Sequence, residues 1–220
     1  MDGNDIIEFY RRIIFGKNYK KIKNKDPHEI KKICFLTAWN DMAMHQTNIV
    51  NKYNNLAAAI GFTLKINKDK IINREDFIGK VFDLSVNELN RVLDNGEKSK
   101  DIIKKLHKNV FHNCFEIGKV QKIVNMYYKY LFTFCLDSST ANINSVFSKY
   151  DSTNFAGCDC PIDNYILNAM EKNGLIDKQQ RKACVWSQMD EPTYNDYQNK
   201  IRNHIKSNEI PLDFDFKNFG

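Results

Sequence analysis

The chain has 220 residues, of which 42% are hydrophobic and 12% aromatic, and this is enough apolar side chain to bury a sizeable core. The composition excludes an intrinsically disordered, collagen-like or coiled-coil protein, and the 9 Gly and 4 Pro argue against a turn-rich β fold. The net charge of +6 permits a nucleic-acid partner, but a solvated, Lys-rich surface explains it at least as well. The 27 Lys are accompanied by 27 Asn and 24 Ile, an excess that is typical of the codon bias of an AT-rich genome.

The N-terminal part of the chain shows apolar residues at helical spacing. Asp26 followed by Pro27 matches an N-cap with proline at the first helical position. Ser85 and Glu88 have the spacing of a capping box, so we expect a separate short helix to begin there and to end at Asn95-Gly96. The pattern predicts helices over 6–15, 27–42, 49–60 and 73–82, a connector over 16–25, and a short strand or extended arm over 63–72.

The C-terminal part of the chain continues the helical pattern. One helical turn is expected over 144–150 within the polar segment 137–159, and the alternating tail after residue 210 is expected to pack back as an extended segment. The pattern predicts helices over 98–108, 120–136, 162–171, 178–188 and 191–207. The sum is an all-α protein of about ten helices, built as a single domain over 1–220 or as two helical subdomains, about 1–84 and 85–220, with a cleft between them.

The six cysteines give no strong metal or disulfide signal. Cys158 and Cys160 form a lone C-x-C pair with no second pair at zinc-ligand spacing. The other four lie in apolar helical patterns and suit the core: Cys34, Cys114, Cys135 and Cys184. We expect no metal and no cofactor. No apolar run reaches the ~20 residues of a membrane span, and no signal-peptide hydrophobic region is visible, so we expect a cytoplasmic protein without membrane contact. Oligomeric state is left open.

The most informative stretches surround Lys122 and Asp163. Lys122 falls in the first turns of an apolar helix, where desolvation and the positive helix end disfavour the charged amine. A neutral amine is a nucleophile. Asp163 falls in the first turn of a different helix, directly after Pro161-Ile162, where the helix dipole stabilises a carboxylate. The pair could therefore supply an amine nucleophile and an anion that assists a developing cation.

These stretches resemble the helix-hairpin-helix (HhH-GPD) superfamily of base-excision DNA glycosylases, especially its 8-oxoguanine DNA glycosylase branch. In that family a Gly-containing hairpin ends in a Lys that starts a long apolar helix, and a Pro-apolar-Asp element starts the next helix. Here residues 118–122 match the hairpin and 161–163 match the Asp element, while 98–108 corresponds to the first helix of the motif. The chain departs from the family at Val120, which stands where a second glycine is usual, and at Glu116-Ile117, which replaces Leu-Pro.

The resemblance implies a base-excision glycosylase and AP lyase that acts on double-stranded DNA by base flipping. Lys122 takes the position of the Schiff-base lysine, and Asp163 stabilises the oxocarbenium-like transition state or moves protons. The hairpin residues would contact the DNA backbone: Gly118, Lys119, Val120 and Gln121. Aromatic side chains would stack on the flipped base, and the candidates are Trp39, Phe111, Tyr127 and Trp186, of which the two tryptophans also suit the core.

Simpler interpretations stay open beside this one. Lys122 also fits a surface lysine on an amphipathic helix, and Asp163 fits a capping residue without catalytic role. Lys129 is a rival amine and Asp159 a rival carboxylate. The alternative functions are a non-catalytic module of phage or defence type that binds a nucleotide, a nucleic acid or a protein, and a structural all-α protein in which the Lys/Asp agreement is accidental.

Overall fold

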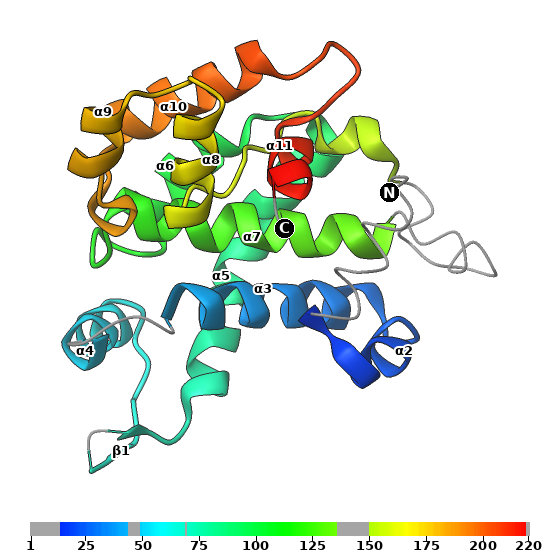
Figure 1. Ribbon diagram of the computed structural model, residues 1–220. Coiled ribbons are helices and arrows are strands. Elements are labelled where there is room, and N and C mark those ends of the chain that lie inside the picture. The colour runs from blue at the N-terminus through cyan, green and yellow to red at the C-terminus, as the bar shows by residue number, and fades with distance from the viewer. Residues whose placement is uncertain (1–13, 44–48, 69, 136–149, 219–220) are drawn as a thin grey trace.

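The fold was analysed in a computed structural model that describes residues 14–43, 49–68, 70–135 and 150–218. The described residues form ten α-helices, three short 3-10 helices and one small antiparallel hairpin (Figure 1). The expectation of an all-α fold is confirmed. No helix in the described ranges is both long and apolar enough to cross a membrane.

The first half of the chain folds largely where the apolar periodicity predicts. The Asp26 carboxylate accepts the Glu29 amide at 3.1 Å, which caps the helix that Pro27 begins. Gly61 turns the chain after the next helix with a φ of +66°, a conformation that glycine adopts without strain. The elements are η1 (Gly16–Asn18), α2 (Tyr19–Ile22), α3 (Pro27–Ala43), α4 (Ile49–Ala59), β1 (Ile66–Asn67), β2 (Lys70–Ile71) and α5 (Arg74–Asn95).

The second half contains the helices that carry the candidate site. Asp163, Asp177 and Asp190 each accept backbone N–H groups at the start of a helix, so short acidic caps set three of the helix starts. The elements are α6 (Ser99–Asn109), α7 (Ile117–Cys135), η4 (Ser152–Phe155), α8 (Asn164–Lys172), α9 (Lys178–Ala183), η5 (Trp186–Gln188), α10 (Glu191–His204) and α11 (Pro211–Asn218).

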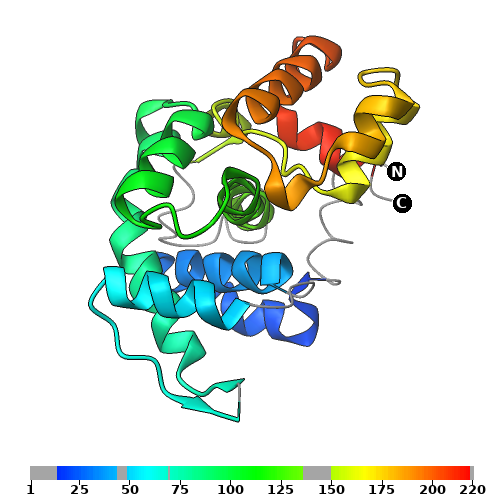
Figure 2. The ribbon, with the colours of Figure 1, turned by 90° about the vertical axis from the view of Figure 1, so that its left-hand side faces the viewer.

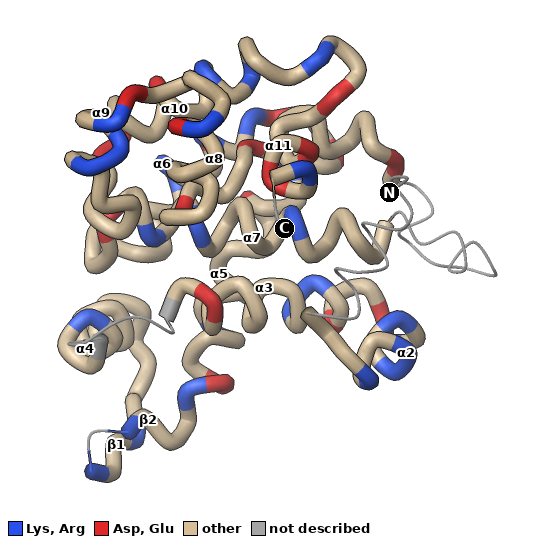
Figure 3. The backbone as a smooth tube through the Cα atoms, viewed as in Figure 1, with Lys and Arg blue, Asp and Glu red and all other residues tan. Residues whose placement is uncertain are grey.

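Helix α7 runs through the middle of the molecule. Figures 1 and 2 show α3 on one side of it, α6 on another, and the group α8 to α11 opposite α3. Every residue from Gly118 to Phe134 is buried, which is the pattern of a helix surrounded by protein rather than one with a solvent-facing side. Lysine positions nevertheless occur along α7 (Figure 3), and a buried ammonium group requires a partner.

The expected helix start at Ser85 is wrong. Residues 74–95 form one continuous helix, and the Ser85 hydroxyl donates to the Val81 carbonyl at 2.7 Å inside it. No Gly or Pro lies between the two predicted helices, and the buried stripe continues through Val81, Leu89 and Val92. Packing of one long apolar stripe therefore outweighs the local capping signal.

The expected extended tail is also wrong, because residues 211–218 form α11. Pro211 stands at its first position, where a missing amide costs nothing. Phe214 and Phe216 are buried together with Asp215, so the apparent alternation of apolar and polar residues hides a helix that is buried on several sides.

Other expectations differ in detail or are untested. The connector over 16–25 contains η1 and α2, and the helix expected over 178–188 ends at Ala183 before η5. The helix expected over 6–15 and the turn expected over 144–150 lie almost wholly outside the described residues. The division into two subdomains with a cleft stays a prediction.

Candidate functional site around Lys122 and Asp163

Asp163 is held by two kinds of contact at the start of α8. Its Oδ1 accepts the backbone amides of Tyr165 at 2.9 Å and Ile166 at 3.0 Å, so it is the N-cap of the helix. Its Oδ2 accepts from Lys122 Nζ at 2.7 Å. Burial acts to raise the pKa of Asp163, but the charge and hydrogen bond of Lys122 and the two amides outweigh it and lower the pKa. One oxygen thus orients the carboxylate and the other faces the amine.

Lys122 lies in the second turn of α7 with a side chain that is 10% exposed. Besides the carboxylate, its ammonium lies 4.9 Å from the ring centroid of Trp186, which belongs to η5. The Asp163 side chain is 26% exposed. The arrangement places a primary amine between a carboxylate and an indole face, at a point that solvent still reaches. It provides the parts of an amine nucleophile with an adjacent proton acceptor.

We expect the charge on Asp163 to make the free energy of unfolding depend on pH in the acid range. Because its folded-state pKa is lowered, the stabilisation is present above the ordinary aspartate pKa and is lost as pH falls through the folded-state value. We expect Asp163→Asn, which keeps an N-cap acceptor, to cost about 1–2 kcal/mol at pH 7. The difference between wild type and variant should shrink below about pH 4. Denaturant unfolding across pH 2.5–7 measures it, and a difference that grows toward acid contradicts this assignment.

Gly118 sets the approach of α7 to η5. Its amide donates to the Met189 carbonyl at 3.0 Å, and a Cβ at this position would lie 1.8 Å from the Trp186 carbonyl oxygen. No side chain fits at that distance, so glycine lets the Trp186 segment lie directly on the first turn of α7. The same contact positions the indole beside Lys122.

Gly118→Ala is expected to push the Trp186 segment away from α7. Overpacking of this kind costs about 1–3 kcal/mol, and the clash with rigid backbone favours the upper end. Thermal unfolding gives the stability loss, and tryptophan fluorescence reports the displaced indole. Gly79→Ala is the control at a buried glycine of another helix, since its new Cβ meets only the end of the flexible Lys32 side chain. Equal stability losses for the two variants would contradict the role given to Gly118.

The four residues expected to contact DNA are all buried in this structure. Gly118 has its amide engaged by Met189, and Val120 is fully buried. Lys119 is buried against Glu116 with 2.6 Å between its Nζ and Oε2. Burial acts to raise the pKa of Glu116, but its hydrogen bonds with Lys119 and Lys52 lower it to about 2. The positive charge of Lys119 is therefore paired inside the protein.

Gln121 acts as a clamp on the segment that carries Asp163. Its Nε2 donates to the Ile162 carbonyl at 2.7 Å and its Oε1 accepts the Ile162 amide at 3.1 Å. Gln198 of α10 holds Cys160 in the same way, with distances of 2.6 and 3.0 Å. Two buried amide side chains thus fix the backbone directly before Asp163.

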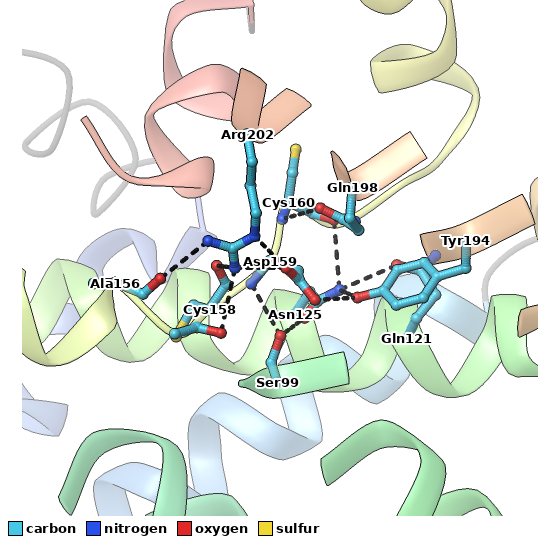
Figure 4. A network of polar contacts seen from close by, with 11 residues as sticks. Ser99, Gln121, Asn125, Ala156, Cys158, Asp159, Cys160, Tyr194, Gln198 and Arg202 are labelled. Atoms are coloured by element: carbon cyan, nitrogen blue, oxygen red, sulfur yellow. Dashed lines mark hydrogen bonds and ion pairs between the residues drawn. The ribbon is translucent and has the colours of Figure 1, made fainter. Parts of the chain in front are cut away.

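A wider polar network surrounds these clamps, and sequence reasoning missed it (Figure 4). Tyr194 donates to Asp159 at 2.9 Å, and Arg202 pairs with the other Asp159 oxygen at 2.7 Å. Arg202 also donates to the Cys158 carbonyl at 2.9 Å. The network joins residues of α6, α7, α10 and the loop before α8: Ser99, Gln121, Asn125, Ala156, Cys158, Asp159, Cys160, Tyr194, Gln198 and Arg202.

All four aromatic residues expected to form a base pocket are buried, and three of them are fully buried in the core. Trp39 and Phe111 stack with their centroids 5.9 Å apart, and both are fully buried. Tyr127 is fully buried as well. Trp186 is the one that contacts Lys122. Large apolar rings at helical spacing are core residues more often than ligand contacts, which is what these three are.

The rival charged residues belong to separate pairs. Lys129 lies 2.8 Å from Asp215 of α11, and both side chains are 4% exposed. Asp159 is held by Arg202 and Tyr194, as above. Cys158 and Cys160 are buried free thiols, and burial raises the pKa of each well above its ordinary value. Within the described ranges no cluster of three or more His, Cys, Asp or Glu could hold a metal.

Comparison of the chain with protein-family models, with curated proteins and with solved structures gives no match. The interpretation of the site therefore rests on its own geometry.

Proposed function

We propose that the protein is a DNA base-excision glycosylase and AP lyase that removes a damaged base, of the 8-oxoguanine kind, through a Schiff base on Lys122. The observation that supports this proposal is the 2.7 Å contact between Lys122 Nζ and Asp163 Oδ2 beside the Trp186 ring. The two residues come from helices far apart in the sequence, and a reaction at a sugar carbon needs both groups at one point.

In the proposed reaction the flipped nucleotide places its sugar against Lys122. Asp163 takes a proton from the ammonium, and the free amine attacks C1′ as the bond from C1′ to the base breaks. The electron pair of that bond stays on the departing base, which takes up a proton from water. The nitrogen then passes a second proton to the ring oxygen as the bond between C1′ and that oxygen breaks, which gives the protonated imine. Loss of a proton from C2′ then allows elimination of the 3′ phosphate. No cofactor is needed for these steps.

Borohydride trapping tests the proposal. The protein is incubated with duplexes that contain 8-oxoguanine, uracil or an abasic site, and reduction converts an imine into a stable covalent band. We expect a band for the wild type and none for Lys122→Gln or Lys122→Arg. The arginine variant is the matched control, because it keeps the charge beside Asp163 but cannot form an imine. Asp163→Asn, which keeps the cap, should lower trapping by at least ~100-fold.

The proposal fails if the folded wild type gives no band on any duplex, or if the band persists in both Lys122 variants. The first result removes a lysine-dependent enzyme. The second shows that another amine reacts and that Lys122 is only a structural cation.

One observation favours the second candidate, a non-catalytic module that binds a nucleotide, a nucleic acid or a protein. The Gly118 amide and the Lys119 ammonium, which would contact a DNA backbone, are both engaged inside the protein. Binding to duplex DNA at several salt concentrations tests whether duplex DNA is a partner, as the first candidate requires. Phosphate contacts give a steep fall of log affinity with log salt, whereas a flat slope removes duplex DNA as the partner.

A further inference from the structure

Helix α9 presents a row of positive charges next to the candidate site. Its six residues include three basic side chains and no acidic one. Because residues three and four apart are neighbours on the surface of a helix, Lys178, Arg181 and Lys182 form one row, which we call the α9 stripe. Figure 3 shows blue segments gathered on α9. Within the part of the chain that the structure describes, no residue of the stripe forms an ion pair.

Contacts at both ends of α9 join the stripe to the site. The Arg181 guanidinium lies against α8, where its Nε donates to Asn168 Oδ1 at 2.6 Å and its Nη2 donates to the Asn164 carbonyl at 3.5 Å. Asn164 directly follows Asp163 in the chain. After Ala183 the chain continues into η5, whose Trp186 ring contacts the candidate amine. The stripe is thus carried by the segment between two elements that build the site.

Arg181 is oriented without being neutralised. Its two hydrogen bonds go to an amide oxygen and a peptide carbonyl, which are neutral acceptors. The other N–H groups of the guanidinium have no partner among the described residues. The neighbouring carboxylate of Asp177 is the N-cap of α9 and accepts the Gln180 amide at 2.7 Å. A guanidinium held in place with free N–H groups suits the oxygens of a phosphate, and the exposed Lys178 and Lys182 add two more charges beside it.

We propose that the α9 stripe binds the phosphate backbone of duplex DNA beside the flipped nucleotide, an inference that rests on the proposed glycosylase function. Three charges on one helical face match a row of phosphates and carry no information about base sequence. Like charges three and four residues apart destabilise a helix, and bound phosphates remove this repulsion. Residues 118–121, which the family resemblance assigns to the backbone, are buried, whereas Lys178 and Lys182 are exposed.

Two variants that each remove three positive charges test the proposal. The α9 variant combines Lys178→Gln, Arg181→Gln and Lys182→Gln. The matched control changes three exposed lysines in and beside the β1–β2 hairpin, which also lack an ion pair among the described residues: Lys65→Gln, Lys68→Gln and Lys70→Gln. Binding to a duplex that carries an abasic site is measured from about 50 to 200 mM salt.

The α9 variant should lose both affinity and salt dependence. Each phosphate contact contributes about 0.9 to the slope of log affinity against log salt, so this slope should become shallower by about 2–3. Affinity at the lowest salt should fall by at least ~10-fold. The control variant should keep the slope of the wild type and stay within about threefold of its affinity, because it alters only the distant charge.

Borohydride trapping separates this inference from the proposed function. On saturating DNA the α9 variant should trap the abasic duplex at the rate of the wild type, because Lys122 and Asp163 are unchanged, while half-saturation should need more DNA. If the wild type traps DNA but the two variants lose affinity and slope equally, or neither loses them, the inference is overturned and the proposed function stands. A lower rate at saturation shows damage to the site and also overturns it. Absence of trapping by the folded wild type overturns the proposed function and this inference with it.

Discussion

Replacement of Lys129 by Met should destabilise the protein by about 3–5 kcal/mol, the largest effect that we expect from one substitution. The change leaves the Asp215 carboxylate buried without the ammonium that lies 2.8 Å from it. Burial already raises the pKa of Asp215 even with Lys129 present. In the variant Asp215 must be desolvated as an anion or take up a proton, so stability should fall further as pH rises from 5 to 8. Denaturant unfolding at several pH values measures both effects.

The double variant Lys129→Met with Asp215→Leu controls for lost packing. Replacing both members of a buried pair by apolar residues is often neutral or stabilising, so most of the lost stability should return. A Lys129→Met variant that loses less than about 1 kcal/mol in free energy of unfolding would show that Asp215 is adequately solvated in the fold. A double variant that is less stable than the single variant would contradict the account in the same way.

Gln121→Met should destabilise the protein by about 2–4 kcal/mol and also weaken the candidate site. Methionine has a similar shape but cannot bond the Ile162 amide and carbonyl, which Gln121 holds at 3.1 and 2.7 Å. A buried backbone group that loses its partner costs about 1–3 kcal/mol. Because Ile162 directly precedes Asp163, the carboxylate should lose its fixed position beside Lys122. Denaturant unfolding and borohydride trapping measure the two consequences.

Gln198→Met is the matched control for this prediction. It removes an equivalent pair of bonds at Cys160, three residues before Asp163, so its stability loss should be similar. Trapping should fall more for Gln121→Met than for Gln198→Met, compared at a temperature where both variants are folded. Equal effects on trapping would mean that Gln121 has only a structural role.

The helices whose signals are local could be predicted from the sequence. The cap at Asp26-Pro27 and the glycine after α4 mark their boundaries through contacts within a few residues. The helix start predicted at Ser85 is wrong because the buried stripe of α5 continues past this residue. The extended tail is wrong because the tail forms α11, which buries Asp215 against Lys129. Both errors come from long-range packing, which periodicity does not contain.

The candidate site was only partly visible in the sequence. The residue types and their helix-start positions pointed to Lys122 and Asp163, and the structure brings their side chains together. Nothing in the sequence marks Trp186 as a neighbour of Lys122 or Gln121 as a partner of Ile162, because the members of each pair come from different elements and meet only in the folded chain. The helical spacing of the apolar face beside Trp39 favours the core position that this residue has.

The most direct test of the central claim is to map the amine that forms the imine. The wild type is trapped with borohydride on a duplex that carries an abasic site, digested, and sequenced by mass spectrometry. The account predicts the reduced sugar adduct on the peptide that contains Lys122, and on that residue within it. An adduct on Lys129, on the N-terminal amine or on scattered surface lysines would contradict the claim that the Lys122 and Asp163 pair carries the chemistry.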